Sequence, residues 1–413
     1  MRIAAPSSPA GKLQTFAALQ NPQFRWLWIA LLVSAVGTWM QIVAQSLLVL
    51  RVTNNSSVAL GTVSLAQAAA FVLFSFVGGG VADRFDKRKL LLVTQSLLAL
   101  CAGLLGILTL TRHITLPGIL LISFVASAVL SFDQPTRGAL VPLLVPRELL
   151  TNAVALQSVA FSAAAAVGPA LAGFLSGPLG PGGIFLLNAV SFVLILIVLW
   201  RLRLSGRATA RDARGSFLQS LKEALGAIRH DRALPWLISG YGAVLFFGPS
   251  VSLILPIFAQ RVLHLDNVGL GWLFTAVGLG NILGGLTVAS FRRLEHQGRV
   301  FLGAVVGWVA ALVALGLSHS LWGAMAALFV FGIALNVVQS VAIAMMQGRV
   351  EDRLRGRLMS VNTLLMMGLR PLGDFPAGAL ATVIGPGGVV LVGAGVVALF
   401  TGFFWTRKGL REA

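Results

Sequence analysis

The sequence has little of what covalent or metal chemistry requires. It contains a single cysteine, Cys101, and five histidines, none spaced as a pair of metal ligands. One cysteine excludes an intramolecular disulfide, and the phosphate-binding pattern G-x-x-x-x-G-K-[ST] is absent, which argues against ATP as an energy source. We therefore expect no enzyme activity, no cofactor and no metal site.

Charged residues are also scarce, at 11% of the chain, whereas hydrophobic residues make up 57%. Soluble domains carry about 25% charged residues, so this composition indicates an integral membrane protein. The net charge is +18, but the cations lie in breaks between apolar runs and not along a stripe with interleaved aromatic residues. This distribution argues against nucleic acid as a partner and favours contact with anionic membrane lipids.

Apolar segments long enough to cross a bilayer recur along the whole chain. A transmembrane helix needs about 20 mostly apolar residues. Twelve segments meet this condition: 26–50, 58–82, 90–111, 117–141, 154–178, 182–200, 234–259, 269–291, 300–319, 321–346, 358–383 and 387–405. The sequence therefore predicts an all-α membrane protein with twelve transmembrane helices.

The longest break, 201–233, divides six predicted spans from six, and the spacing of its apolar residues predicts a short amphipathic helix. We expect an N-terminal segment (1–25), a six-helix bundle (26–200), this linker, a second six-helix bundle (234–405) and a tail (406–413). Of the 31 Lys and Arg residues, 26 fall in the termini and in alternate breaks, and Arg137 lies near the same side in the fourth predicted span, which predicts that both termini and the linker are cytoplasmic.

The two halves resemble each other at a constant offset of 205 residues. Gln134 aligns with Gln339 and Gly168 with Gly373, and the residues around each position match in part. A shared offset indicates two parallel repeats, a construction found in secondary transporters. Two independent six-span domains would leave this offset unexplained.

The break after the second predicted span carries charges of both signs between two apolar runs. It resembles the loop between spans 2 and 3 of the major facilitator superfamily, G-x-x-x-D-R-x-G-R-R/K. Asp86 stands where the family usually has glycine. In the family the acidic residue meets the cytoplasmic start of span 11, which implies a latch between Asp83 and 355–358. The matching residues are Gly79, Asp83, Arg84, Lys87 and Arg88.

Three runs resemble more narrowly the enterobactin exporter branch of the superfamily, which includes siderophore and drug exporters. They are 83–88, the span 4 run 132–140, and 144–149 followed by Asn152 and Ala153. The resemblance implies two pseudo-symmetric six-helix bundles. It also implies export of a small amphipathic organic molecule, drug-like or siderophore-like, by alternating access in exchange for protons. The expected partners are this substrate, protons and membrane lipids, for a monomer in the inner cell membrane.

Two other functions stay open. Related superfamily members flip lysophospholipids across the inner membrane, which is a different transport reading of the same fold. A polytopic receptor or scaffold without transport is a different class, and the short outer loops disfavour it.

Arg370 and Asp374 are the deepest charges, near the middle of the eleventh predicted span, and their spacing puts them on one helix face. A lone charge at the bilayer centre costs about 3 kcal/mol, so such residues line a water-filled path or pair with each other. One interpretation is mutual neutralisation. The other is that Asp374 takes up and releases a proton as the pair opens and closes.

Asp133 and Arg137 form a second pair at the same spacing, with Gln134 and Pro135 between them. They lie in the cytoplasmic third of the fourth predicted span. The pair either orients a substrate or forms part of an inner gate, or it is a helix-end pair that reaches the headgroups.

Small and polar residues inside other spans complete the candidates. Gly168, Pro169 and Gly173 resemble in part the span 5 segment G-P-x-x-G-G of drug and proton antiporters, which implies a hinge. In the family fold spans 1, 4, 7 and 10 line the cavity. That placement brings together, besides Gln134, the candidates Gln41, Gln45, Tyr241, Asn336 and Gln339.

Overall fold

The computed structural model describes residues 16–202, 217–290 and 296–412. This part of the chain is helical apart from its turns, and no strand occurs in it. The helices are α1 (Pro22–Val52), α2 (Ser57–Arg84), α3 (Lys87–Leu110), α4 (Leu116–Leu140), α5 (Leu150–Leu175), α6 (Gly180–Arg201), α7 (Phe217–His230), α8 (Leu234–Phe247), α9 (Val251–Arg261), α10 (Asn267–Ser290), α11 (Gln297–Gly316), α12 (Leu321–Gly348), α13 (Asp352–Leu364), α14 (Arg370–Val383), α15 (Gly385–Trp405) and α16 (Lys408–Arg411).

Capping residues set the start of the first four helices. In each case a side-chain oxygen accepts a hydrogen bond from a backbone N–H of the first turn, which has no partner within the helix. Asp86 caps α3 in this way, with 2.8 Å between its Oδ1 and the nitrogen of Lys89. The acid that departs from the family pattern is therefore a helix cap. The four capping residues are Asn21, Ser56, Asp86 and Thr115.

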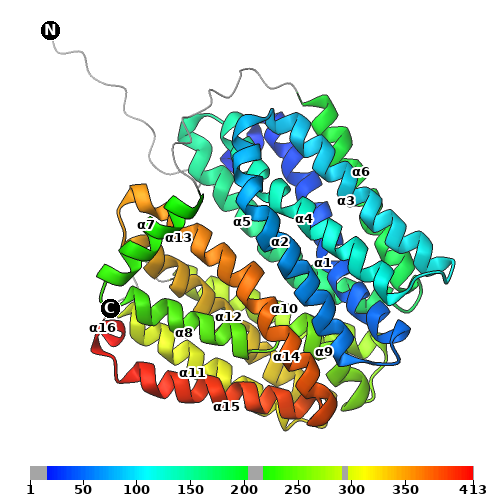
Figure 1. Ribbon diagram of the computed structural model, residues 1–413, viewed down its shortest axis with the longest axis vertical. Helices are drawn as coiled ribbons and strands as arrows, with labels where there is room; N and C mark the ends of the chain where they lie inside the picture. The colour runs from blue at the N-terminus through cyan, green and yellow to red at the C-terminus, as the bar shows by residue number, and fades with distance from the viewer. Residues whose placement is uncertain (1–15, 203–216, 291–295, 413) are drawn as a thin grey trace.

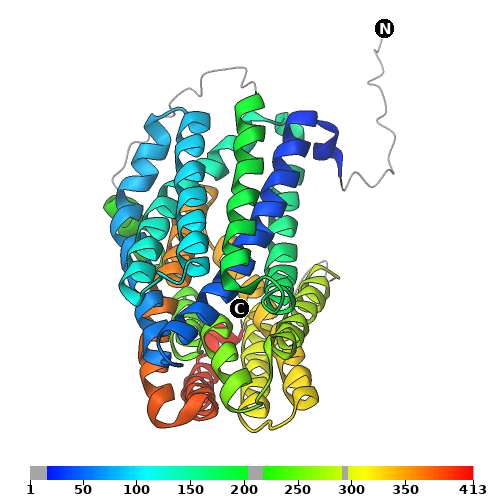
Figure 2. The same cartoon turned by 90° about the vertical axis from the view of Figure 1, so that its right-hand side faces the viewer.

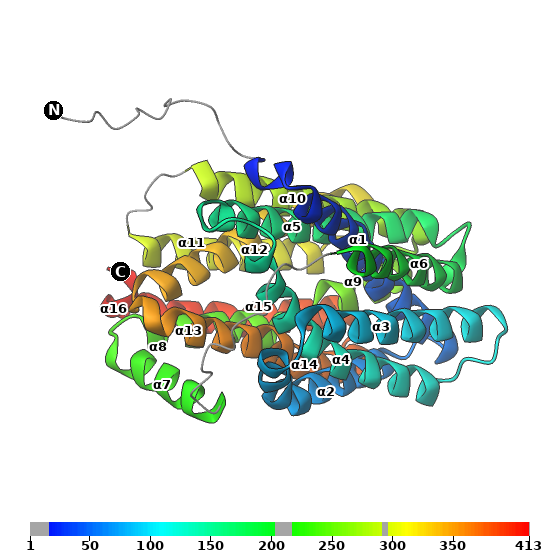
Figure 3. The ribbon, with the colours of Figure 1, turned by 90° about the horizontal axis from the view of Figure 1, so that it is seen from above.

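The helices form two bundles, α1–α6 and α8–α15, with α7 between them in the chain (Figure 1). Figure 2 shows the first bundle above the second. Two helix pairs join the bundles: α2 runs along α14, and α5 runs along α10 (Figure 3). At the second junction a Cβ on Gly173 would collide with the backbone of Gly271. The expected six-plus-six arrangement is thus the observed one.

Both bundles have their helix ends on two opposite sides. We name the end with Leu202 and Thr406 the inner end, and the end with Thr53 and Ile384 the outer end. The bundles lean apart toward the inner end and meet at the outer end (Figure 1).

Direct contacts close the outer end. There Nη2 of Arg261 donates a hydrogen bond to the carbonyl of Asn55 across the two halves, at 2.6 Å. Gly378 packs so closely on Ser57 that an added Cβ would collide with the Ser57 carbonyl.

Eleven helical segments in the described residues are long and apolar enough to span a membrane. The seventh predicted span is broken between α8 and α9, at Gly248, Pro249 and Ser250. The eleventh comes in three pieces: α13, the π-helical turn η4 (Leu365–Leu369) and α14. Pro371 is the second residue of α14 and lacks an N–H group, so the missing donor falls directly after the π-helical turn, where the regular hydrogen-bond pattern already changes. Both interruptions lie in the second bundle.

The predicted linker helix is present as α7, and it packs against α13 and α8 of the second bundle. Glu223 of α7 forms an ion pair with Arg357 of α13. Just after α7, Asp231 accepts hydrogen bonds from the first N–H groups of α8 and lies 3.5 Å from Nη1 of Arg349. The described end of the linker, from α7 to Asp231, is therefore bound to the second half.

Candidate functional site

Asp374 lies on α14, where the eleventh span contacts the break in the seventh span. Its side chain is 5% exposed, and Oδ1 accepts a hydrogen bond of 3.0 Å from the backbone nitrogen of Ser250. Ser250 belongs to the break between α8 and α9, where backbone N–H groups have no helical partner. The break thus leaves the Ser250 N–H group free to donate in the middle of the span, and α14 positions the Asp374 carboxylate to accept this hydrogen bond.

Arg370 lies one turn before Asp374 on the same helix face and is partly buried. No ion pair joins the two, and Arg370 makes no hydrogen bond to any residue that the structure describes. Its charge still acts on the Asp374 carboxylate and on the hydroxyl of Tyr241 in α8. The Tyr241 side chain is fully buried, and its hydroxyl lies 3.3 Å from the sulfur of Met366.

Asp133 in α4 has the opposite surroundings, because all of its acceptor positions are occupied. Its Oδ2 accepts from Nη2 and Nε of Arg137 at 2.7 and 2.8 Å. Its Oδ1 accepts from Oγ1 of Thr94 at 2.7 Å and from Nε2 of Gln95 at 2.6 Å. Asp133 is 0% exposed, whereas the neighbouring Gln134 is exposed. This cluster ties α3 to α4.

The charged loop after α2 is described only in part, since the side chains of Gly79, Asp83 and Arg84 lie outside the described residues. Lys87 is buried, and its Nζ donates to the Phe85 carbonyl at 3.2 Å. Nε of Arg88 donates to the Leu199 carbonyl at 2.7 Å, and Nη2 donates to the next carbonyl. Arg88 therefore satisfies the carbonyl end of α6. The segment 355–358, the expected partner of the latch, carries the ion pair of Arg357 to α7.

The span 5 residues lie in a continuous helix, since α5 runs through Pro169 without a break. Gly168 faces α1, where an added Cβ would meet the Trp39 side chain at 2.5 Å. Gly173 faces Gly271 of α10 at the junction of the halves. These glycines allow close helix contact in this conformation.

The expected cavity residues are distributed over several helix contacts. Gln41 accepts a hydrogen bond of 2.6 Å from Asn188 of α6. Asn336 accepts one of 3.2 Å from Ser340 on its own helix, α12. Gln339 is partly buried. Gln45 donates to Ser123 of α4 at 3.0 Å, and it also lines a pocket near the outer end.

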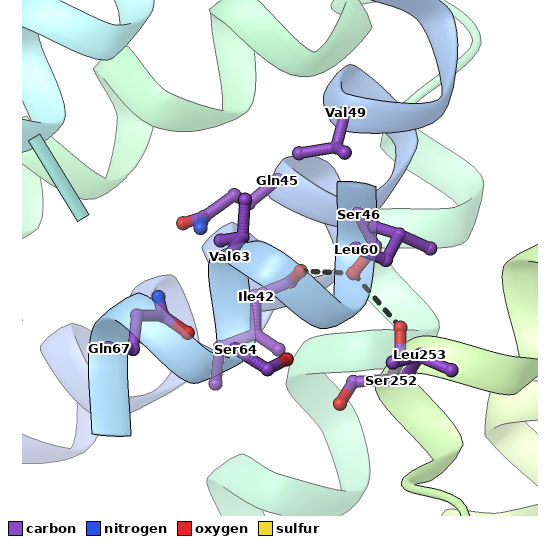
Figure 4. Close-up of a pocket in the computed structure, with 10 residues that line it drawn as sticks. All are labelled: Ile42, Gln45, Ser46, Val49, Leu60, Val63, Ser64, Gln67, Ser252 and Leu253. Carbon is purple, nitrogen blue, oxygen red and sulfur yellow. Dashed lines mark hydrogen bonds between the residues drawn. The ribbon is translucent and has the colours of Figure 1, made fainter. Parts of the chain in front are cut away.

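This outer pocket lies between α1, α2 and α9, with a volume of about 70 Å³ (Figure 4). Oγ of Ser46 donates to the Ser252 carbonyl at 2.9 Å, and this bond joins the two halves. Sequence reasoning missed Ser46, Ser250 and Ser252, although Gly248-Pro249 inside an apolar segment is a signal for a break. The lining residues are Ile42, Gln45, Ser46, Val49, Leu60, Val63, Ser64, Gln67, Ser252 and Leu253.

Proteins of known name resemble this chain over most of its length. The macrolide efflux protein A of Streptococcus pyogenes is 22% identical over 344 residues, covering 80% of this chain and 83% of that protein. The staphyloferrin A transporter of Staphylococcus aureus is 23% identical over 353 residues, covering 85% and 87%. An enterobactin exporter of Citrobacter koseri is 25% identical over 347 residues, covering 82% and 80%.

Solved structures share the fold. The nucleoside transporter NupG aligns with a TM-score of 0.75 at 13% identity, covering 94% of this chain and 99% of that one. A bacterial homologue of the iron transporter ferroportin, in an inward-facing state, aligns with a TM-score of 0.73 at 19% identity, covering 94% and 98%.

A family model described as transmembrane secretion effector matches residues 13–413, which is nearly the whole chain. The match agrees with the two six-helix bundles and with the transporters that share this fold. The chain therefore belongs to the transmembrane secretion effector family of the major facilitator superfamily, a family of membrane transporters and not of enzymes.

Proposed function

We propose that this chain exports a small amphipathic organic molecule across the inner cell membrane, in exchange for protons that bind Asp374. The names of its relatives include a macrolide, staphyloferrin A and enterobactin as cargo, which supports a drug-like or siderophore-like substrate. The concentration of Lys and Arg at the inner end supports a cytoplasmic location for that end and for both termini.

The observation that carries the proposal is the environment of Asp374. It is a buried carboxylate inside a membrane span with one backbone donor and no ion pair. A charge in this position is costly, and a proton removes the charge. The carboxylate therefore has a reason to bind a proton that Asp133, with four donated hydrogen bonds, does not have.

Proton binding at Asp374 changes the contact between α14 and the break in span 7. Ionised Asp374 accepts a charge-assisted hydrogen bond from Ser250, which is about twice as strong as a neutral one. Protonation weakens this bond and releases α14 from the start of α9. Because α14 also lies along α2 of the other half, this local change reaches the junction of the two bundles. It provides the link between proton binding and alternating access.

In the present conformation the bundles are apart at the inner end, which suits loading of substrate from the cytoplasm. The opposite conformation requires the inner end to close. We propose that Asp83 then docks at the start of α13, where α7 now holds Arg357 through Glu223. We propose a monomer as the transporting unit, because one chain supplies both bundles.

The test uses proteoliposomes with and without an imposed pH gradient, and a panel of dyes, macrolides and siderophores. Native protein is expected to move at least one compound faster when the gradient is imposed. Asp374→Asn keeps the size and the hydrogen bond from Ser250 but cannot bind a proton, so the gradient is expected to have no effect on it.

Asp133→Asn is the matched control, because it removes the other buried carboxylate of a membrane span. It is expected to keep gradient-driven transport in the fraction that folds. Full gradient-driven transport by Asp374→Asn would exclude the proposed role. Flux of lipid independent of the gradient would support a flippase, and no flux of any compound would support a receptor or scaffold.

A further inference from the structure

We infer that the outer pocket and the hydroxyls of Ser252 and Ser250 form the route by which a proton reaches Asp374 once the outer end, which direct contacts close in the present conformation, has opened. This inference rests on the proposed function of Asp374 as the proton-binding group. It adds the route and two residues that hold it.

The pocket is suited to hold water. Its volume of about 70 Å³ exceeds the roughly 10–15 Å³ that one water molecule needs. Half of its ten lining residues are polar, and Figure 4 shows Gln45, Gln67 and Ser64 around the same space as Ser252. The side chains of Ser64 and Gln67 make no hydrogen bond to any residue that the structure describes, so water is their available partner.

The pocket and Asp374 are joined by two hydroxyls. Oγ of Ser252 lines the pocket and donates to Oγ of Ser250 at 3.4 Å. Ser250 donates its backbone N–H to Oδ1 of Asp374, and its side chain also faces this carboxylate. Ser250 and Asp374 are only 4% and 5% exposed, so a proton reaches the carboxylate through a side chain and not through bulk water.

A serine hydroxyl donates one hydrogen and accepts others, which allows it to pass a proton on. A hydronium ion in the pocket gives a proton to Oγ of Ser252, whose own proton moves to Oγ of Ser250. The proton of Ser250 moves to a carboxylate oxygen of Asp374. The products are a water molecule, two intact hydroxyls and a neutral carboxylic acid, so charge and atoms balance.

The groups around this route favour Asp374 as its end point. The titratable groups next to it are Arg370 on its own helix and, beyond Arg370, Tyr241 on α8. No carboxylate of the described residues lines the pocket itself, so the nearest one along the serine hydroxyls is Asp374. Toward the outer end, the bond from Ser46 to the Ser252 carbonyl holds α9 against α1, and it leaves Oγ of Ser252 free for the route.

The experiment follows protonation of Asp374 directly, with the proton as the probe. Proteoliposomes are prepared with the outer end toward the bath, and protection of residues 201–233 from added protease checks this orientation. After a rapid drop in external pH, infrared spectroscopy records the C=O band of the protonated acid, which is assigned by its loss in Asp374→Asn.

We expect Ser252→Ala and Ser250→Ala to slow the appearance of this band at least about tenfold, the effect of about 1.4 kcal/mol in the barrier. Ser252→Thr keeps a hydroxyl and is expected to protonate at nearly the native rate. Ser176→Ala is the matched control, since Ser176, the residue that follows α5, is buried at 2% exposure and its hydroxyl donates only to the Ala172 carbonyl.

Native rates in both alanine variants would overturn the route while leaving Asp374 as the proton-binding group. A native protein that shows no band assignable to Asp374 would overturn the proposed function and the route together. If an alanine variant fails to fold, Ser252→Val and Ser252→Thr provide a pair of similar shape that differs in the hydroxyl, and equal rates in that pair overturn the route.

Discussion

The two halves of this protein each carry one Asp–Arg pair inside a membrane span, at positions i and i+4, and only one of the two pairs forms an ion pair. In the first half Asp133 and Arg137 lie 2.7 Å apart, with Thr94 and Gln95 completing the cluster. In the second half Arg370 and Asp374 form no ion pair, and Asp374 accepts from the Ser250 backbone.

The order of the residues explains the difference. Side chains on a helix lean toward its N-terminus, so a long cation four residues after an acid reaches back to it. A cation four residues before an acid leans away from it. Acid before base is accordingly the better arrangement in isolated helices. Asp133-Arg137 has the favourable order, and Arg370-Asp374 has the reverse order and follows a π-helical turn.

The comparison teaches that equal spacing of charges in two spans does not imply an equal role. In the first pair Asp133 is held by Arg137 of its own helix and by Thr94 and Gln95 of α3. In the second pair the buried Asp374 carboxylate has no ion pair and accepts from the Ser250 backbone at the junction of α8, α9 and α14.

Exchanging the second pair is expected to abolish its function. The double variant Arg370→Asp with Asp374→Arg puts the acid before the base, as in the first half, so the ion pair closes and the bond to Ser250 is lost. We expect gradient-driven flux to fall to that of empty liposomes, while the variant still folds. The single variant Asp374→Arg serves as the control, and it is expected to lower the melting temperature because two cations then share the helix. Native flux in the double variant would contradict the assigned roles.

Removing one charge of the first pair is expected to reduce stability. Asp133→Asn leaves Arg137 partly buried without its counter-ion, and it replaces one of the two oxygens that accept from Arg137, Thr94 and Gln95 by an NH2 group that only donates. Breaking a buried pair costs about 3–5 kcal/mol, and the 27% exposure of the Arg137 side chain places this one at the lower end. Thermal unfolding in detergent measures the loss. A melting temperature equal to that of Asp374→Asn would show that the two pairs do not differ.

A larger side chain at Gly173 is expected to separate the halves at the outer end. A Cβ there collides with the Gly271 backbone, so Gly173→Leu disfavours the contact of α5 and α10. Spin-label distances across the outer end are expected to increase. Gly177→Leu is the matched control, because nothing lies within 4 Å of a Cβ at Gly177. Unchanged distances in Gly173→Leu would contradict the importance of this contact.

Loss of the contact at the outer rim is expected to have the smallest effect. Arg261→Ala removes the hydrogen bond to the Asn55 carbonyl, and a bond of this kind contributes about 0.5–1.5 kcal/mol. We expect a shift of a few-fold toward the outward-open state, measured by the rate at which a thiol reagent labels a cysteine placed at Ser64. Arg112→Ala, at another outer turn, is expected to leave that rate unchanged.

Much of the fold could be predicted from the sequence, because the bilayer fixes the length and apolarity of each span. The spans agree with the helices to within a few residues, and the repeat at 205 residues corresponds to two bundles. The breaks in spans 7 and 11 were not predicted. Pro249 and Pro371 lie in apolar segments, and hydropathy does not show whether a proline bends a helix or interrupts it.

The site could be predicted only in part. Asp374 stood out because a charge inside a span is rare, and burial supports that emphasis. The spacing in the sequence pairs Asp374 with Arg370. In the structure Asp374 instead accepts a hydrogen bond from the backbone N–H of Ser250, 124 residues earlier in the chain. The Asp133 cluster needed Thr94 and Gln95 from another helix, and no local pattern identifies such partners.

The sequence by itself determined the twelve predicted spans, the pairing of charges by spacing and the side of the membrane that the cations favour. These features depend on the free energy of transferring side chains from water to lipid, which is set within each segment and does not require contacts with other helices. Only the tertiary structure decided which charges are neutralised, that α2 meets α14 and α5 meets α10, and that a polar pocket lies beside the serines that lead to Asp374. Those features depend on distances between helices far apart in the chain, where a shift of a few ångströms makes or breaks a hydrogen bond.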